Sequence, residues 1–483
     1  MSRIVEVFEE ICLSKGQQTA IVYREGKKIR RKSFCELDCD VRKMAAYLSS
    51  CNVKKGDRIL AFASSSYKLC VFMLASLETG ASIMYVDIWA KQEKLARIFA
   101  DYEPQMVLVS DKTKHLRKLF GEIGKIRQVI NIDRFERFSA ESYALTDIEE
   151  DTTALLTMTT GSTGKPKIAL RTHRDLMHQL ELINSNITCG SNETVLTTSY
   201  IYVFANILNG FTTVLPQLNL GKYRSGRINR LLKLFENEPV SMIITSPDFC
   251  LKAQNIFPKL KTLYFGGAIL NLHEAMLIRK KFNSCLCQVI YGSTECNLIA
   301  TANLDEFIKV LKEEQRSILG RAVNGVRIKL DDNGEILVSS RALLKSYLTS
   351  DPYTKETDES GILWHRTSDI AQDNGELIYF LGKNKNFINV GGSKIYSNCI
   401  EQKLIANFCD IPKCAVLEHN NSVYVFLQGS KKSVDITEIR RFLQDIGIDE
   451  PKIKFTKKIP CDAKHHTKIN YNKLKERLNN GRI

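Results

Sequence analysis

The chain has 483 residues, of which 44% are apolar, 8% aromatic and 25% charged, a length and composition that suit two or three globular domains and exclude a disordered or collagen-like protein. The net charge of +15 is compatible with an acidic or phosphate-bearing partner, but no nucleic-acid-binding motif accompanies it, so we expect no nucleic acid partner. No apolar run approaches 18 residues and the N-terminal segment contains Glu6, Glu9 and Glu10, so we expect no membrane insertion and no signal peptide, and predict a cytoplasmic protein.

Short β-branched runs alternate with helix-like segments through the first three hundred residues. The helix-like segments include 67–78 and 228–236. This alternation predicts an α/β architecture with largely parallel sheets. The expected strands are 59–63, 106–109, 128–132, 242–245, 262–265 and 288–291.

The pattern changes from about residue 320. The short runs 326–330 and 335–338 flank a turn sequence, and a second turn sequence at 373–375 separates two further runs, which predicts a small β-rich subdomain. The last hundred residues have their own expected elements, a strand at 423–427 and helices at 435–445 and 471–478. We therefore predict a large N-terminal α/β domain over 1–383 and a small α+β C-terminal domain over 384–483.

A loop of hydroxyl groups, glycines and lysines follows an apolar run at 155–158. Glycines allow backbone N–H groups to approach an anion, and the hydroxyls and lysines add donors and charge, which is the chemistry of a polyphosphate site. It is not a Walker A loop, because only two residues separate Gly161 from Gly164 and Pro166 follows the lysine. A plain polar turn is the alternative. The loop residues are Thr159, Thr160, Gly161, Ser162, Thr163, Gly164 and Lys165.

This loop resembles the phosphate-loop signature of the AMP-forming adenylating superfamily, which includes acyl-CoA synthetases, adenylation domains and luciferases. Five later segments resemble the superfamily's other motifs in the same order. They are Phe265-Gly266-Gly267-Ala268, Tyr291-Gly292-Ser293-Thr294-Glu295, 364–369, 382–389 and 467–470. The resemblance implies ATP and Mg²⁺ as ligands, activation of a carboxylic acid as its adenylate, and a mobile C-terminal domain that swings between two half-reactions at a hinge, Lys385.

The resemblance also implies a role for individual residues. Lys468, Thr163 and Glu295 would be catalytic, with Lys468 stabilising charge on the carboxylate and α-phosphate, while Glu295 and Thr294 would hold Mg²⁺. Asp369 would accept hydrogen bonds from the ribose. The nucleotide would contact Thr159, Thr160, Gly161, Ser162, Thr163, Gly164, Lys165, Gly266, Gly267, Ala268, Tyr291, Gly292, Ser293, Thr294, Asp369 and Lys383.

Some positions depart from the superfamily pattern. Ile168 and Ser368 stand where glycine is usual, and Lys383 stands in place of arginine, which keeps the charge but loses the bidentate fork. Serine at 368 is tolerated if that backbone does not need a positive φ. These changes leave open a non-catalytic nucleotide-binding protein as an alternative.

The segment 199–210 lies where the superfamily forms part of its acyl pocket, for which we expect Tyr202, Phe204, Ala205 and Asn209. No acidic residue follows Phe204 to pair with an α-ammonium group, so we expect an apolar acyl or aryl acid rather than an amino acid. The expected acceptor is the thiol of CoA or of phosphopantetheine on an acyl carrier protein. A β-lactone or another non-thioester product is the alternative.

Overall fold

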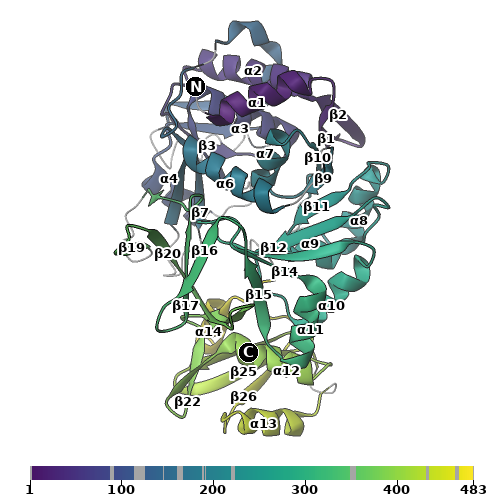
Figure 1. The fold of residues 1–483 in the computed structure, drawn as a ribbon, viewed down its shortest axis with the longest axis vertical. Helices are drawn as coiled ribbons and strands as arrows, with labels where there is room; N and C mark the ends of the chain where they lie inside the picture. Colours follow the sequence, from purple (N-terminus) through teal and green to yellow (C-terminus); the bar gives the residue numbers. More distant parts are fainter. Residues whose placement is uncertain are drawn as a thin grey trace.

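The computed structural model describes residues 3–86, 92–111, 113, 126–144, 146–159, 167–187, 190, 192–218, 223–348, 355–430, 434–462 and 467–481. Figure 1 shows helices α1 (Arg3–Ser14), α2 (Phe34–Ser50) and α3 (Tyr67–Thr79) at one end of the long axis. Strands β25 (Ser422–Gln428) and β26 (Lys452–Thr456) lie at the opposite end, with helix α13 (Ile436–Asp445). The N-terminal and C-terminal parts of the chain are thus separated along this axis.

The first sheet is mixed but mainly parallel. Its parallel part is formed by short apolar strands, as expected where both faces of a sheet are covered. Helix α3 is buried all round; it begins at the capping residue Ser66 and ends at Gly80, whose φ of 69° is left-handed. Across the described residues the strand order is β18 (Ser346–Tyr347), β8 (Lys167–Thr172), β7 (Thr153–Thr159), β4 (Ser82–Val86), β3 (Arg58–Phe62), β5 (Met106–Val109) and β6 (Gln128–Asn131).

The second sheet joins an α/β region to a β-rich region. Its parallel strands are β1 (Thr19–Glu25), β10 (Thr212–Leu215), β9 (Thr194–Thr197), β11 (Met242–Thr245), β12 (Thr262–Gly266) and β13 (Leu286–Tyr291). The edge strand β2 (Lys28–Ser33) pairs with β1 in antiparallel fashion. The antiparallel strands beyond β13 are β14 (Ala300–Asn303), β15 (Ser317–Ala322), β21 (Ile378–Lys383), β20 (Leu363–Asp373), β17 (Glu335–Ser340) and β16 (Val326–Leu330), with β19 (Lys355–Thr357) beside β20.

The remaining helices of this part of the chain accompany the two sheets. Helix α8 ends at Leu232 and a 3₁₀ turn continues to Phe235, where the sequence predicted one helix to residue 236. The helices are α4 (Gln92–Tyr102), α6 (His173–Asn186), α7 (Tyr200–Leu208), α8 (Ser225–Leu232), α9 (Pro247–Lys252), α10 (Leu272–Lys281) and α11 (Leu304–Glu313). The predicted α/β class with a β-rich subdomain is confirmed, and the six expected strands are β3, β5, β6, β11, β12 and β13.

The C-terminal part has apolar clusters of its own. One cluster includes Ile388, Leu404, Val425 and Leu443, so it joins helices α12 (Ser397–Asn407) and α13 to the local strands. A smaller cluster packs α14 (Tyr471–Asn479) on β24 (Cys414–His419) and β25. The hairpin of β22 (Phe387–Val390) and β23 (Ser393–Tyr396) precedes α12. The domain boundary at residue 383 stays a prediction. Within the described ranges, no helix is both long enough and apolar enough to cross a bilayer.

Candidate active site

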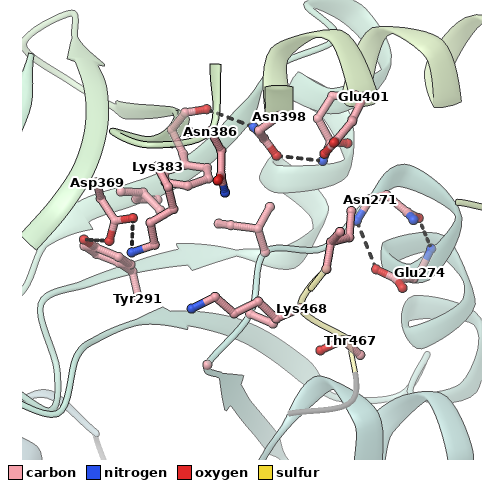
Figure 2. A pocket seen from close by; sticks show the side chains of 18 of the residues that line it. Asn271, Glu274, Tyr291, Asp369, Lys383, Asn386, Asn398, Glu401, Thr467 and Lys468 are labelled. Carbon is pink, nitrogen blue, oxygen red and sulfur yellow. Dashed lines mark hydrogen bonds and ion pairs between the residues drawn. The ribbon is translucent and has the colours of Figure 1, made fainter. Parts of the chain in front are cut away.

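A cavity of about 200 Å³ lies between the carboxyl ends of strands β12 and β13 and the C-terminal part of the chain. Parallel strands place their carboxyl ends at one sheet edge, where ligands commonly bind. Residues that the sequence predicted for nucleotide binding or catalysis line this cavity from five separate segments (Figure 2). They are Gly267, Ala268, Tyr291, Gly292, Asp369, Lys383 and Lys468.

Asp369 is the centre of a hydrogen-bonded group in this cavity. Its Oδ2 accepts a 2.8 Å hydrogen bond from the hydroxyl of Tyr291, and its Oδ1 forms an ion pair with Lys383. Burial and the carboxylate of Asp369 raise the pKa of Tyr291, so its hydroxyl remains a donor. A carboxylate has about four lone-pair sites, so these two contacts leave acceptor capacity for ribose hydroxyls. Lys383 thus pairs directly with the carboxylate expected to bind ribose.

The backbone of Ser368 corrects one expectation from the sequence. Its φ is +60°, so the chain does require the left-handed region at this position, and the condition on which serine was expected to be tolerated is not met. Ser368 is held there by hydrogen bonds on both sides, from its N–H to Glu335 (2.8 Å) and from the N–H of Asn384 to its carbonyl (3.0 Å). Serine therefore adopts the strained backbone of the usual glycine.

Replacing Ser368 with glycine is expected to raise the free energy of unfolding by about 0.5–1 kcal/mol, because relief of the left-handed strain exceeds the added entropy of unfolded glycine. Urea denaturation measures this change. Ser339→Gly is the matched control: Ser339 lies in strand β17 without a positive φ, so glycine should lower stability there. Equal destabilisation by both substitutions would contradict the prediction.

Lys468 enters the cavity from the segment before α14. Its carbonyl accepts a 2.8 Å hydrogen bond from the N–H of Asp462, which fixes the backbone beside it. In Figure 2 its ammonium points towards the group formed by Tyr291, Asp369 and Lys383. Burial and the nearby charge of Lys383 lower the pKa of Lys468, while Asp369 opposes that shift. An anionic ligand would relieve this repulsion, so the electrostatics favour one.

The predicted phosphate loop lies almost wholly outside the described residues. Thr160, Gly161, Ser162, Thr163, Gly164 and Lys165 fall in the gap 160–166. Thr159 is the last residue of β7 and pairs with Lys167 of β8, so the two ends of the loop meet at one end of this hairpin. The roles expected of the loop residues, Thr163 included, stay predictions.

Glu295 lies beside a second group of charged side chains, outside the lining of the cavity. Its Oε1 accepts a 2.8 Å hydrogen bond from Tyr347, and its Oε2 lies 3.9 Å from Nε2 of His365. Burial would raise the pKa of Glu295, but the charge of His365 and the hydrogen bond from Tyr347 hold that pKa below its ordinary value. Glu295 is therefore ionised and offers carboxylate oxygens, the kind of ligand that Mg²⁺ prefers, while its role as a ligand stays a prediction.

Three cations, Lys167, Arg171 and Lys355, interact with Glu295, and Asp175 is a second carboxylate that acts on Arg171 and Lys355. Burial lowers the pKa of Lys355 to about 8 and of Arg171 to about 10, and in both cases Glu295 opposes the shift. Lys167 and Lys355 lie over the ring of Tyr347, at 5.5 and 5.4 Å from its centroid. No group of three or more His, Cys, Asp or Glu side chains among the described residues is arranged to hold a metal. This donor set fits Mg²⁺ that takes most of its ligands from phosphates and water.

Arg171 fixes the backbone that carries Glu295. It donates hydrogen bonds to Thr157 (2.7 Å), to Gln179 (2.9 Å) and to the carbonyl of Thr294. Sequence reasoning missed Arg171, although an arginine in the apolar strand just after the phosphate loop was a usable signal. Tyr347 and Lys355 had no such signal. The hydroxyl of Ser293 accepts from the N–H groups of residues 295 and 296, so this side chain shapes the turn.

Two motif glycines are required by packing of the backbone itself. A Cβ at Gly266 would overlap the carbonyl of Ile290 on the neighbouring strand, and one at Gly292 would overlap the carbonyl of Asn297. Both glycines thus keep β12, β13 and the turn after it close together. Gly267 and Ala268 follow β12 directly and line the cavity.

The residues predicted for the acyl pocket lie elsewhere. Phe204 and Ala205 are buried in a core cluster that also includes residues of α1, and Tyr202 packs against it. Asn209 donates a 2.5 Å hydrogen bond to Asn184. None of the four lines the described cavity.

Lys385, the predicted hinge, lies between β21 and β22, and burial together with Lys383 lowers its pKa. The assignments of the acyl pocket and of the hinge both stay predictions.

The family model that describes AMP-binding enzymes matches residues 8–348, which is more than half of the chain. The chain belongs to the AMP-binding enzyme family. Its curated relatives in this family include a 2-succinylbenzoate–CoA ligase of Listeria monocytogenes, 23% identical over 95% of this chain and 97% of that protein. Surfactin synthase subunit 1 of Bacillus subtilis is 24% identical over 83% of this chain, but the match spans only 12% of that longer protein.

Solved structures of AMP-binding enzymes have the same fold. The O-succinylbenzoate CoA synthetase of Bacillus subtilis in complex with AMP has a TM-score of 0.80 at 20% identity, covering 97% of this chain and 98% of that one. ATP-bound MatB from Rhodopseudomonas palustris has a TM-score of 0.81 at 18% identity, covering 99% and 100%. At these identities the likeness concerns the fold.

Proposed function

We propose that this AMP-binding enzyme activates a carboxylic acid with ATP and Mg²⁺. A carboxylate oxygen attacks the α-phosphorus, the bond to the β-phosphate oxygen breaks, and pyrophosphate leaves with that electron pair. The acyl group then passes to a thiol of CoA or of carrier-bound phosphopantetheine, and AMP is released. The observation that carries the proposal is the meeting of Tyr291, Asp369, Lys383 and Lys468 in one cavity.

The charges of the site suit this reaction. Both reactants are anions, so approach requires neutralisation and alignment. Lys468 would contact the carboxylate and α-phosphate oxygens, and Asp369 would accept from the ribose. Glu295, with Thr294 beside it, would hold Mg²⁺, which screens the phosphate charges when bound. The excess of buried cations around Glu295 supports a polyphosphate ligand on that side.

The acid is proposed to be apolar or aryl. This rests on the absence of an acidic residue after Phe204 and on the apolar character of α7. The relatives named above include both a CoA ligase and a peptide synthetase subunit, so CoA and a carrier-bound thiol remain the two acceptors proposed. A cytoplasmic location is proposed with them.

The test is ATP-dependent pyrophosphate release, trapped with hydroxylamine, across short, long, aryl, β-hydroxy and α-amino acids. An acid-dependent signal with an apolar or aryl acid supports the proposal. Preference for an α-amino acid would contradict the substrate class alone. ATP binding without pyrophosphate release for every acid would favour a nucleotide-binding protein without catalysis. Adding CoA or a phosphopantetheine-loaded carrier to the active reaction then identifies the acceptor.

A further inference from the structure

Lys413 links the segment Thr467–Lys468, which carries the lysine proposed to be catalytic, to the N-terminal part of the chain. Its ammonium lies 2.9 Å from Oε1 of Glu274, in the first turn of α10, and donates a 2.8 Å hydrogen bond to the carbonyl of Thr467. Thr467 directly precedes Lys468. The side chains of Lys413 and Glu274 are only 14% and 15% exposed, so this contact is largely shielded from water. One buried ammonium thus bridges two segments that face the same cavity.

Glu274 is itself fixed in place. It forms a capping box with Asn271, accepting from the N–H of Asn271 (3.2 Å) and donating its own N–H to Oδ1 of Asn271 (2.9 Å). The side chain of Asn271 also donates a 3.1 Å hydrogen bond to the carbonyl of Pro412. The start of α10 therefore contacts both Pro412 and Lys413, and Figure 2 shows Asn271 and Glu274 beside Thr467.

The segment on the other side of Lys413 is held by backbone pairing. The N–H of Asp462 donates to the carbonyl of Lys468, and the N–H of Asn470 donates to the carbonyl of Pro460, both at 2.8 Å. The carbonyl of Thr467 lies at the end of this pairing and receives the ammonium of Lys413. Lys468 is thus fixed on one side by the strand-like pairing and on the other by Lys413.

We propose that Lys413 is a positioning residue, which together with Glu274 holds the Thr467–Lys468 segment so that Lys468 faces the nucleotide cavity during adenylate formation. The inference rests on the proposed function. Burial opposes the charge of Lys413, but Glu274 raises its pKa, so the bridging ammonium is retained. Turning the C-terminal part away from α10 would separate a shielded ion pair, which favours the arrangement seen here.

Three variants separate the parts of this contact. Lys413→Met removes the ion pair and the hydrogen bond to Thr467 while keeping the length of the side chain. Glu274→Gln removes only the negative charge. The double variant Glu274→Lys/Lys413→Glu reverses the pair, but a carboxylate at 413 cannot donate to the carbonyl of Thr467. Asn407→Ala is the control, because Asn407 forms a more exposed hydrogen bond with Gln315 across the same two parts of the chain.

Two readouts test the proposal. We expect Lys413→Met to lower kcat for adenylate formation about tenfold with the KM for ATP changed less than twofold, because misplacement affects the reacting geometry. Transfer from a supplied acyl-adenylate to the thiol should be unchanged. Hydrogen exchange at the amides of Asp462 and Asn470 should accelerate in Lys413→Met. The double reversal should remain slow in adenylate formation, and Asn407→Ala should match the parent protein.

Failure of the positioning role of Lys413 can be distinguished from failure of the proposed function. Unchanged exchange and unchanged kcat in Lys413→Met would overturn the positioning role, as would equal losses in both half-reactions or full recovery in the double reversal. A parent protein that forms no adenylate with any acid would overturn the proposed function. In that case the exchange readout still decides whether Lys413 holds the segment, since it needs no turnover.

Discussion

Replacing Lys468 with alanine is expected to lower kcat for adenylate formation by about 10²–10³-fold, the usual loss when one preorganised charge-stabilising donor is removed. Lys468 lines the same cavity as Asp369 and Tyr291, so we expect it to contact the α-phosphate when Asp369 holds the ribose as proposed. Acid-dependent exchange of labelled pyrophosphate into ATP measures the effect. The KM for ATP should change much less, because the remaining nucleotide contacts are intact.

The matched control is Lys473→Ala. Lys473 lies on α14, five residues further along the chain, and its side chain is exposed. Its replacement by alanine changes the net charge by the same amount as Lys468→Ala. It should leave the rate of pyrophosphate exchange within twofold of that of the parent protein. Unaltered exchange in Lys468→Ala would contradict the assigned role, and equal losses in both variants would point to a general effect of charge.

The same residue sets an expected pH dependence. Burial and Lys383 lower the pKa of Lys468 below its ordinary value of 10.5. Since the protonated amine is the form that stabilises phosphate charge, activity should fall on the alkaline side as the pH rises through this lowered pKa. The pH profile of the residual activity of Lys468→Ala should not show this alkaline decrease. The comparison uses kcat/KM profiles of the two proteins.

Replacing Glu78 with methionine is expected to increase the free energy of unfolding by about 3 kcal/mol at pH 7. Glu78 is 1% exposed at the end of helix α3, and neither carboxylate oxygen has a hydrogen-bond partner among the described residues. Its neighbours around a small gap are otherwise apolar. They are Ile4, Val5, Phe8, Leu74, Leu77, Phe204 and Leu208. Methionine has a similar length and no charge to bury.

The sign of the pH dependence follows from the direction of the shift. Burial, with Asp38 adding to it, raises the pKa of Glu78 from 4.5 to about 8. Below pH 4.5 both the folded and the unfolded chain are protonated here, so the ionisation of this group costs no stability. Between 4.5 and 8 only the unfolded chain loses the proton, and stability falls by about 1.4 kcal/mol per pH unit. Above 8 the penalty stays constant.

Urea denaturation at pH 5 and pH 7.5 tests this prediction. The gain from Glu78→Met should be small at pH 5 and several times larger at pH 7.5. The control Glu181→Met replaces an exposed glutamate of α6 and should change stability by less than about 0.5 kcal/mol at both values. A gain that does not depend on pH would show that packing alone, without ionisation, explains the effect.

The sequence predicted six parallel strands because burial on both faces leaves a continuous apolar run, but it missed the parallel strands β1, β4, β9 and β10. Strand β5 is such a case, since all four of its residues are buried. Strand β2 could not be predicted, because Lys28–Ser33 has no apolar alternation and is an edge strand specified by its pairing with β1. A charged edge of this kind also opposes pairing with other chains.

The features of the candidate site also fall into two groups, those that sequence motifs predicted and those that no motif could predict. Tyr291, Asp369 and Lys468 belong to motifs, so each was predicted although the residues are far apart in sequence. The contact of Lys413 with Glu274 joins residues 139 positions apart, with no local pattern at either one. The left-handed φ of Ser368 could be stated from the sequence only as a condition, because no run of residue types reports a backbone angle.

The walls of the cavity come from segments on both sides of residue 383, with Tyr291 and Asp369 on one and Lys468 on the other. A molecule that contacts both walls stabilises the arrangement in which they face each other, because it binds strongly only in that arrangement. Its concentration and the separation of the two parts are consequently coupled by mass action. Each tenfold rise in a saturating ligand adds about 1.4 kcal/mol against separation, so nucleotide supply would limit the swinging of the C-terminal part that the family resemblance implies.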